Sequence, residues 1–163
     1  MVYHKSSIKH LVYGCQIWGQ TNNYFNDKNF KLQNRALRII TFSNFRADSC
    51  PLYNHLKILK LKDQIILQNC LFVYDALKKV SPICFQEYFR HASDVHIMNT
   101  RSSSLGCLFV TFNRTITYGL KSITNQCISH WNVMSKKFNI NLLSLSRLKL
   151  KLNIKLHFVQ LYS

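Results

Sequence analysis

The stretch "FKLQNRALRIIT", residues 30–41, is the segment from which the fold class is most easily read. In a helix, with 100° between successive residues, its apolar residues fall into one arc and its basic residues lie side by side on the flank of that arc. The arc consists of Leu32, Ala36, Ile39 and Ile40, and the basic row of Lys31, Arg35 and Arg38, which Lys28 extends by one turn. The segment therefore predicts an amphipathic helix whose apolar arc is buried and whose row of cations is available for other contacts.

Most of the remaining chain also follows helical spacing. The longest pattern covers residues 61–79, "LKDQIILQNCLFVYDALKK", and its wide apolar arc predicts a central helix. The apolar run at 105–112, "LGCLFVTF", fits a strand or a buried extended segment. Residues 147–158 alternate apolar and polar as a strand does, yet Leu and Lys favour a helix, which we prefer. We predict a mainly α fold, a thumb-like or C-terminal helical bundle with at most a short extended segment near 105–112.

The charge balance is the strongest signal in the composition. The 163 residues include 22 Lys and Arg against 6 Asp and Glu, a formal net charge of +16. Such a charge repels itself unless an anionic partner compensates it, and nucleic acid is the usual partner, ahead of a membrane surface. The four cations of the basic row are 3, 4 and 3 residues apart, so they share one helical face and can contact successive phosphates. The candidate nucleic-acid-binding residues are Lys28, Lys31, Arg35 and Arg38, with a merely solvated face as the alternative.

Two further features have an open interpretation. Aromatic residues near the basic row are candidates for stacking on bases, or else for the core: Tyr13, Trp18, Tyr24 and Phe25. A second basic region fits a nucleic acid or a membrane surface equally well, and it consists of Lys136, Lys137, Arg147, Lys149, Lys151 and Lys155.

Residues suited to catalysis or metal binding are scattered. The six carboxylates include no Asp-Asp and no Asp-x-Asp, whereas a two-metal site needs carboxylates that converge on ions about 4 Å apart. The set Cys84, His91, His96 and Cys107 lacks the close pair with which zinc sites begin. The six Cys form no close pair, which indicates reduced thiols and an intracellular location, and no apolar run approaches the ~20 residues of a membrane span. We expect no catalytic residue, metal, cofactor or small-molecule substrate.

Six motifs follow one another in a recognisable order. They are "IKHLVYGCQIWG" (8–19), "LQNRALRIIT" (32–41), "PLYNHLKILKLKDQIILQNCLFVYDAL" (51–77), "SPICFQEYF" (81–89), His96 with Thr100-Arg101, and "YGLKSITNQCISHWN" (118–132). In this order the chain resembles the C-terminal end of the reverse transcriptase of non-LTR, LINE-type (jockey-like) retrotransposons. It departs from that pattern at Cys127, where Gly is common, and at Val133-Met134, where Leu-Pro is expected, which suggests relaxed constraint.

The resemblance implies that the full-length family protein is a polymerase and that this chain alone is not active as one. In such proteins the endonuclease and the palm, with its Tyr/Phe-x-Asp-Asp centre, lie upstream. Residues 1–90 would be a thumb-like segment following the palm, and residues 91–163 a basic C-terminal helical segment. The chain would be a fragment of an RNA-directed DNA polymerase, inactive alone, with Mg²⁺ needed only by the full-length protein.

The resemblance also implies the partner and the place of binding. The fragment would bind the backbone of RNA or of an RNA–DNA hybrid, in the nucleus or cytoplasm, through the four cations named above and Arg101 of the His…Thr-Arg motif. A membrane partner is not expected. The alternatives are a transposon remnant that folds poorly and a basic amphipathic protein that binds membranes.

Overall fold

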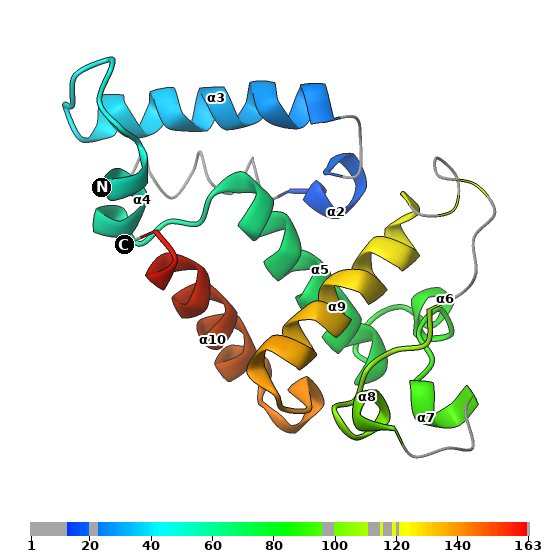
Figure 1. Ribbon diagram of the computed structural model, residues 1–163. Coiled ribbons are helices and arrows are strands. Elements are labelled where there is room, and N and C mark those ends of the chain that lie inside the picture. Colours follow the sequence, from blue (N-terminus) through cyan, green and yellow to red (C-terminus); the bar gives the residue numbers. More distant parts are fainter. Residues whose placement is uncertain are drawn as a thin grey trace. The chain divides into compact units, whose positions relative to one another are not determined.

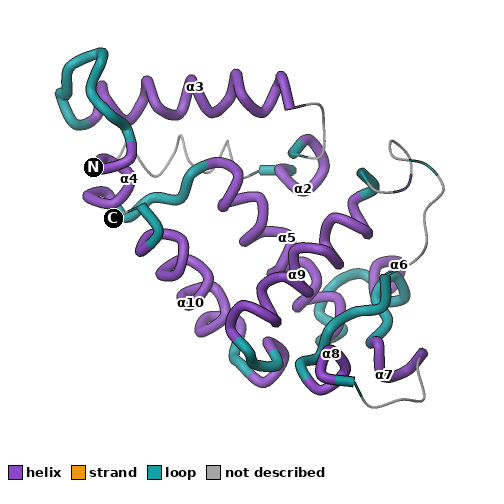
Figure 2. Tube along the Cα trace, in the orientation of Figure 1, coloured by secondary structure: helices purple, strands orange, loops and turns teal. Residues whose placement is uncertain are grey.

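The computed structural model describes residues 13–19, 23–95, 100–110, 115, 119 and 121–162, and these are mainly helical (Figures 1 and 2). The long helices are α3 (Asn23–Ile40), α5 (Leu61–Leu77), α9 (Ile123–Phe138) and α10 (Arg147–Gln160). The short ones are α2 (Cys15–Trp18), α4 (Cys50–Leu56), α6 (Ile83–Gln86), α7 (Ala92–Val95), α8 (Arg101–Ser104) and the 3-10 turn η2 (Leu142–Ser144). The predicted mainly α fold is confirmed.

Of the extended segment predicted near 105–112, residues 107–110 are neither helix nor turn, whereas Leu105 and Gly106 form the turn that follows α8. Leu108 forms an isolated antiparallel bridge with His91, and no strand occurs among the residues that the structure describes. Residues 111 and 112 lie outside the described residues.

The described residues pack into two compact units. The first comprises the described residues up to Ile65 together with those from Asn153 onward, and the second comprises Ile66–Leu152. Helices α5 and α10 each pass from one unit to the other. The division into 1–90 and 91–163 refers to segments of the family protein and stays a prediction.

Phe30 of α3 joins the two small apolar clusters of the first unit. One cluster consists of Cys15, Leu61 and Ile65, and the other of Leu37, Tyr53 and Ile58. The rings of Phe30 and Tyr53 stack with centroids 6.4 Å apart, and Tyr162 packs edge-on against Tyr53 at 6.0 Å. An aromatic layer therefore holds α3 on the rest of its unit.

The residue Tyr162 also ties the segment after α10 to the start of α5. Its hydroxyl donates to the Asp63 carboxylate and accepts a hydrogen bond from the Lys60 amide at 3.1 Å. Because the hydroxyl is both donor and acceptor, the last described turn of the chain is fixed on the first unit.

Helix α3 buries a different face from the one that its apolar arc predicts. Leu32 and Ile39 are 61 % and 65 % exposed, and Ala36 is exposed as well. The positions turned to the interior are Asn26, Phe30, Gln33 and Leu37. The prediction that the apolar arc is the buried face is wrong.

The reason lies in two amide side chains that find partners on the backbone. Gln33 donates from Nε2 to the Leu59 carbonyl at 3.0 Å and accepts at Oε1 from the Leu61 amide at 2.9 Å. Asn26, in the first turn of the helix, donates from Nδ2 to the Gly19 carbonyl at 3.0 Å. A polar group that is hydrogen-bonded can face the interior at little cost, and this holds for both ends of the Gln33 amide and for the amide nitrogen of Asn26. Gln33 above all thus takes the interior position that the apolar arc was expected to fill.

In the second unit, Trp131 and Asn132 of α9 anchor the extended segment. The fully buried Trp131 donates from Nε1 to the Gly106 carbonyl at 3.1 Å. Asn132 accepts from the Leu108 amide at 2.7 Å and donates to the Leu108 carbonyl at 2.9 Å. Trp131 and Asn132, the last two residues of the motif at 118–132, therefore have a structural role. Gly106 is required at its own position, because its φ is +66° and a Cβ there would meet the Asn141 side chain at 2.5 Å.

Other motif positions are structural too. Phe85 and Phe89 of "SPICFQEYF" meet Phe72 of α5 edge-on at 5.3 and 5.9 Å. Ser122 is the N-cap of α9 and accepts from the Asn125 amide at 3.4 Å. These residues close the second unit around α5 and α9.

The segment 147–158 is helical, as predicted, and forms most of α10. In α10 the buried side chains recur every fourth residue, at Leu150, Ile154 and Phe158. A second apolar stripe, at Leu148, Leu152 and Leu156, is exposed. The alternation that resembles a strand therefore arises from two helical stripes separated by cations.

Candidate nucleic-acid interface

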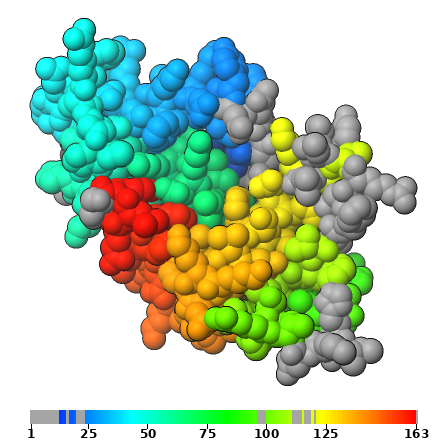
Figure 3. Space-filling model, in the orientation of Figure 1, coloured from blue at the N-terminus to red at the C-terminus, as the bar shows by residue number. Residues whose placement is uncertain are grey.

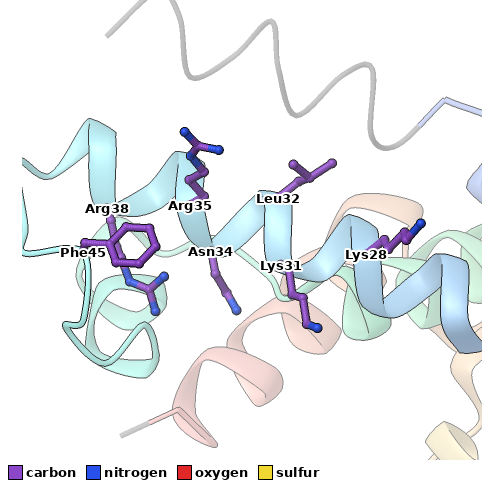
Figure 4. Close-up of a pocket in the computed structure, with 7 residues that line it drawn as sticks. All are labelled: Lys28, Lys31, Leu32, Asn34, Arg35, Arg38 and Phe45. Atoms are coloured by element: carbon purple, nitrogen blue, oxygen red, sulfur yellow. The ribbon is translucent and has the colours of Figure 1, made fainter.

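The four cations of the basic row stand on one face of α3, as the spacing predicts (Figure 4). Lys28, Lys31 and Arg35 are exposed and Arg38 is partly buried. Figure 4 shows how the side chains spread from that face: Lys31 and Arg38 point toward one edge of the helix and Arg35 toward the other. The segment from α3 to α4 lies at the surface in the space-filling view (Figure 3).

These side chains line a groove of about 560 Å³, which we call the α3 groove. Its lining consists of Lys28, Lys31, Leu32, Asn34, Arg35, Arg38 and Phe45. The groove thus combines four cations, one amide, one aliphatic side chain and one aromatic ring, with no carboxylate in that lining.

Arg38 is held in place by the loop that follows α3. Its Nε donates to the Ala47 carbonyl at 2.9 Å, and the Ala47 amide donates to the Asn44 carbonyl at 3.0 Å. The terminal nitrogens of the guanidinium retain donors with which to bind a carboxylate or phosphate. The helix and the loop therefore position this cation together.

Among the described residues, no acidic side chain lines the α3 groove. All six side-chain carboxylates of the sequence are described, and one of them, Asp75, forms an ion pair with Arg147 at 2.7 Å, outside the groove. Lys28 lies over the ring of Tyr24, 4.4 Å from its centroid, which leaves its charge in place. Clustered cations without acidic partners attract a polyanion.

Arg101 is not part of this cluster. It is the first residue of α8 in the second unit, is exposed, and donates to Asn139 Oδ1 at 3.4 Å. Thr100 before it caps α8 by accepting from the Ser103 amide at 3.3 Å. His96 of the same motif lies outside the described residues. The role of Arg101 in binding stays a prediction.

The aromatic candidates divide between core and surface. Trp18 packs on the cluster around Cys15 and donates from Nε1 to the Tyr13 carbonyl at 2.9 Å. Tyr24 and Phe25 are each 58 % exposed and pack edge-on at 5.5 Å. Tyr13 is exposed. None of these residues belongs to the described lining of the α3 groove.

Two residues of the α3 groove, Phe45 and Asn34, were not predicted from the sequence. Phe45 lies in "SNFRADSCP", residues 43–51, and a lone aromatic residue in a polar loop beside a basic helix is the signal that could have identified it. Asn34 is positioned by Tyr53, whose hydroxyl donates to Asn34 Oδ1 at 2.7 Å. Because Tyr53 comes 19 residues later, no local pattern reveals that contact.

The possible metal ligands among the described residues do not converge. No group of three or more His, Cys, Asp or Glu side chains within the described ranges is placed to hold a metal ion. All six cysteines carry free thiols. Burial raises the pKa of Cys15 to about 11 and that of Cys127 to about 12, so both thiols stay protonated at neutral pH and are poor nucleophiles.

Comparisons with known proteins give no relative: no protein-family model, curated protein or solved structure matches this chain. The resemblance to the non-LTR reverse transcriptases thus depends on the order of the six motifs and stays a prediction. Among the helices that the structure describes, none is both long and apolar enough to cross a membrane.

Proposed function

We propose that this chain binds the backbone of RNA or of an RNA–DNA hybrid through the α3 groove, as a C-terminal, thumb-like fragment of a non-LTR retrotransposon RNA-directed DNA polymerase. The observation that carries the binding is the cluster of four cations in one groove, without a carboxylate partner. The assignment to the polymerase depends on the motif order in the sequence.

The dimensions of the basic row suit a polynucleotide. Ten residues separate Lys28 from Arg38, and at a rise of 1.5 Å per residue the row is about 15 Å long. Successive phosphates of one strand are about 3.4 Å apart along a duplex axis, so the row spans several of them. Contacts of this kind position a protein on the backbone and read no sequence.

Fluorescence anisotropy of the chain with labelled RNA across a range of salt concentrations tests the proposal. Each phosphate contact on a single strand contributes about −0.7 to the slope of log affinity against log salt, so four engaged cations give a slope of about −3. The double variant Lys31→Glu/Arg35→Glu should weaken binding and roughly halve that slope. Neither side chain makes a hydrogen bond or ion pair within the described residues, so the fold should survive.

The matched control is Lys62→Glu/Lys78→Glu, which changes the net charge by the same amount at two exposed positions outside the groove and outside the second basic region. Circular dichroism establishes that each variant is helical. If both double variants weaken binding equally, only the net charge matters and the α3 groove is not the site. Unchanged binding by the α3 variant would refute the proposal.

A further inference from the structure

Two exposed phenylalanines stand beside the cations of α3. Phe42 is 97 % exposed and Phe45 is 75 % exposed. Phe45 lines the α3 groove, and both rings line a neighbouring hollow of about 460 Å³ together with Arg35, Arg38 and Ile39. Large aromatic side chains normally contribute to folding by leaving water, which these two do not.

The backbone holds the two rings in that position. Helix α3 ends in a Schellman arrangement, in which the Ser43 amide donates to the Arg38 carbonyl at 2.9 Å and the Phe42 amide to the Ile39 carbonyl at 3.3 Å. Phe42 has a φ of +52°, at the position where helices usually carry Gly or Asn. A bulky ring in that conformation is unfavourable for folding, and such local strain often marks a functional position.

The loop after Phe42 is also fixed. Asn44 accepts from the Ala47 amide at 3.0 Å and, through its side chain, from the Arg46 amide at 3.2 Å. Arg38 reaches the same loop through its bond to Ala47. Phe45 is therefore presented beside the Arg38 guanidinium before any ligand arrives, which lowers the entropic cost of binding.

An aromatic ring beside cations that bind phosphate is the arrangement that recognises unpaired nucleotides. Every base has a π face, so stacking on a ring is insensitive to sequence, while cations hold the adjoining phosphates. In a duplex the base faces are covered by their neighbours, so the ring has nothing to stack on. Unstacked bases of single strands, loops and ends are the usual partners of such rings in RNA recognition.

We infer that the α3 groove takes single-stranded RNA, with an unpaired base stacked on Phe45 and the adjoining phosphates held by Arg35 and Arg38. The inference deepens the proposed function and rests on it, because the phosphate contacts are those already proposed. Phe42 offers a second ring to the next base along the strand.

The test compares three labelled RNA probes of about 12 nucleotides, within the usual site size of single-strand binders. They are an unpaired strand, the same strand with abasic sites, and a blunt duplex. The unchanged chain should bind the unpaired strand at least about five-fold tighter than the abasic strand, the lower end of what one stacked base contributes. Phe45→Ala should abolish that preference and leave the affinities for the abasic strand and the duplex unchanged.

Two further variants make the test specific. Phe45→Trp should restore the preference, because an indole ring also stacks. Tyr88→Ala removes a half-exposed ring of the second unit that does not line the α3 groove, and it should change none of the three affinities.

Each other outcome overturns the inference in a distinguishable way. If the unchanged chain binds all three probes equally and Lys31→Glu/Arg35→Glu weakens all three, stacking is refuted and the proposed function stands. If a soluble, helical chain binds no probe, both fail. If Phe45→Ala weakens all three probes equally, the ring only supports the loop. If Phe45→Ala weakens adsorption to vesicles of anionic phospholipid and leaves RNA binding unchanged, the ring contacts a membrane surface and not a base.

Discussion

Replacing Gln33 by Ala should destabilise the first unit more than any surface change on α3. The substitution leaves two buried backbone groups, the Leu59 carbonyl and the Leu61 amide, without the partners that Gln33 supplies at 3.0 and 2.9 Å. A buried group left unpaired costs about 1–3 kcal/mol. The expected loss in the free energy of unfolding is therefore about 2–6 kcal/mol, a large part of the about 5–15 kcal/mol that stabilises a typical domain.

Urea denaturation followed by far-UV circular dichroism measures this loss. The control is Gln160→Ala, an exposed position near the end of α10, where a change within about 0.5 kcal/mol is expected. Gln33→Glu separates the two bonds, because a carboxylate still accepts from the Leu61 amide but cannot donate to the Leu59 carbonyl. A Gln33→Ala variant as stable as the unchanged chain would refute the account of why α3 buries this face.

Three further predictions concern single residues. Phe42→Gly should raise the free energy of unfolding by about 0.5–1 kcal/mol, because Gly adopts the positive φ without strain and the exposed ring of Phe42 makes few contacts that would be lost. Urea denaturation measures this change, and a loss of stability would contradict the reasoning. The exposed thiol of Cys84 should react at once with a disulfide reagent at neutral pH, whereas Cys127, buried and with its pKa raised to about 12, should react only after unfolding. Burial lowers the pKa of His130 below its ordinary value of 6.5, so the unfolded chain takes up the proton first and stability should fall as the pH drops below 6.5. His130→Gln should reduce that fall when denaturation is compared on either side of pH 6.5, and an identical pH dependence would show that other groups cause it.

The helices could be predicted from sequence because their signals are local. The 3, 4, 3 spacing of the cations places Lys28 to Arg38 on one face whatever else α3 contacts. The preference for a helix at 147–158 also follows from residue type, and the structure has α10 there. The extended segment near Leu108 was recognisable as an apolar run without helical spacing.

The buried face of α3 could not be predicted, because it depends on contacts distant in sequence. Gln33 bonds to residues 26 and 28 positions later, and without those partners an apolar arc is the better candidate for the interior. Phe45 was missed for a related reason. Its place in the α3 groove follows from a helix end in which Phe42 takes a conformation that sequence patterns assign to Gly.

The motifs that carry the family resemblance are largely structural. Ser122 caps a helix, Trp131 fills the core of its unit, and Asn132 pairs with the extended segment. Positions with such roles resist substitution for reasons of folding. The resemblance therefore bears on the fold, while the proposed activity depends on the cations of the α3 groove.

The position of Tyr162 has a consequence for the order of events during synthesis. The unit that bears the α3 groove is completed by residues from Asn153 onward, and Tyr162 contacts Lys60 and Asp63, about a hundred positions earlier. All of Ile66–Leu152 leaves the ribosome before that closing segment. The second unit, Ile66–Leu152, can thus fold on the nascent chain, whereas the contacts of Tyr162 with Lys60 and Asp63 form late because they join distant parts of the sequence. Assembly of the groove is thereby coupled to synthesis of the segment that carries Tyr162.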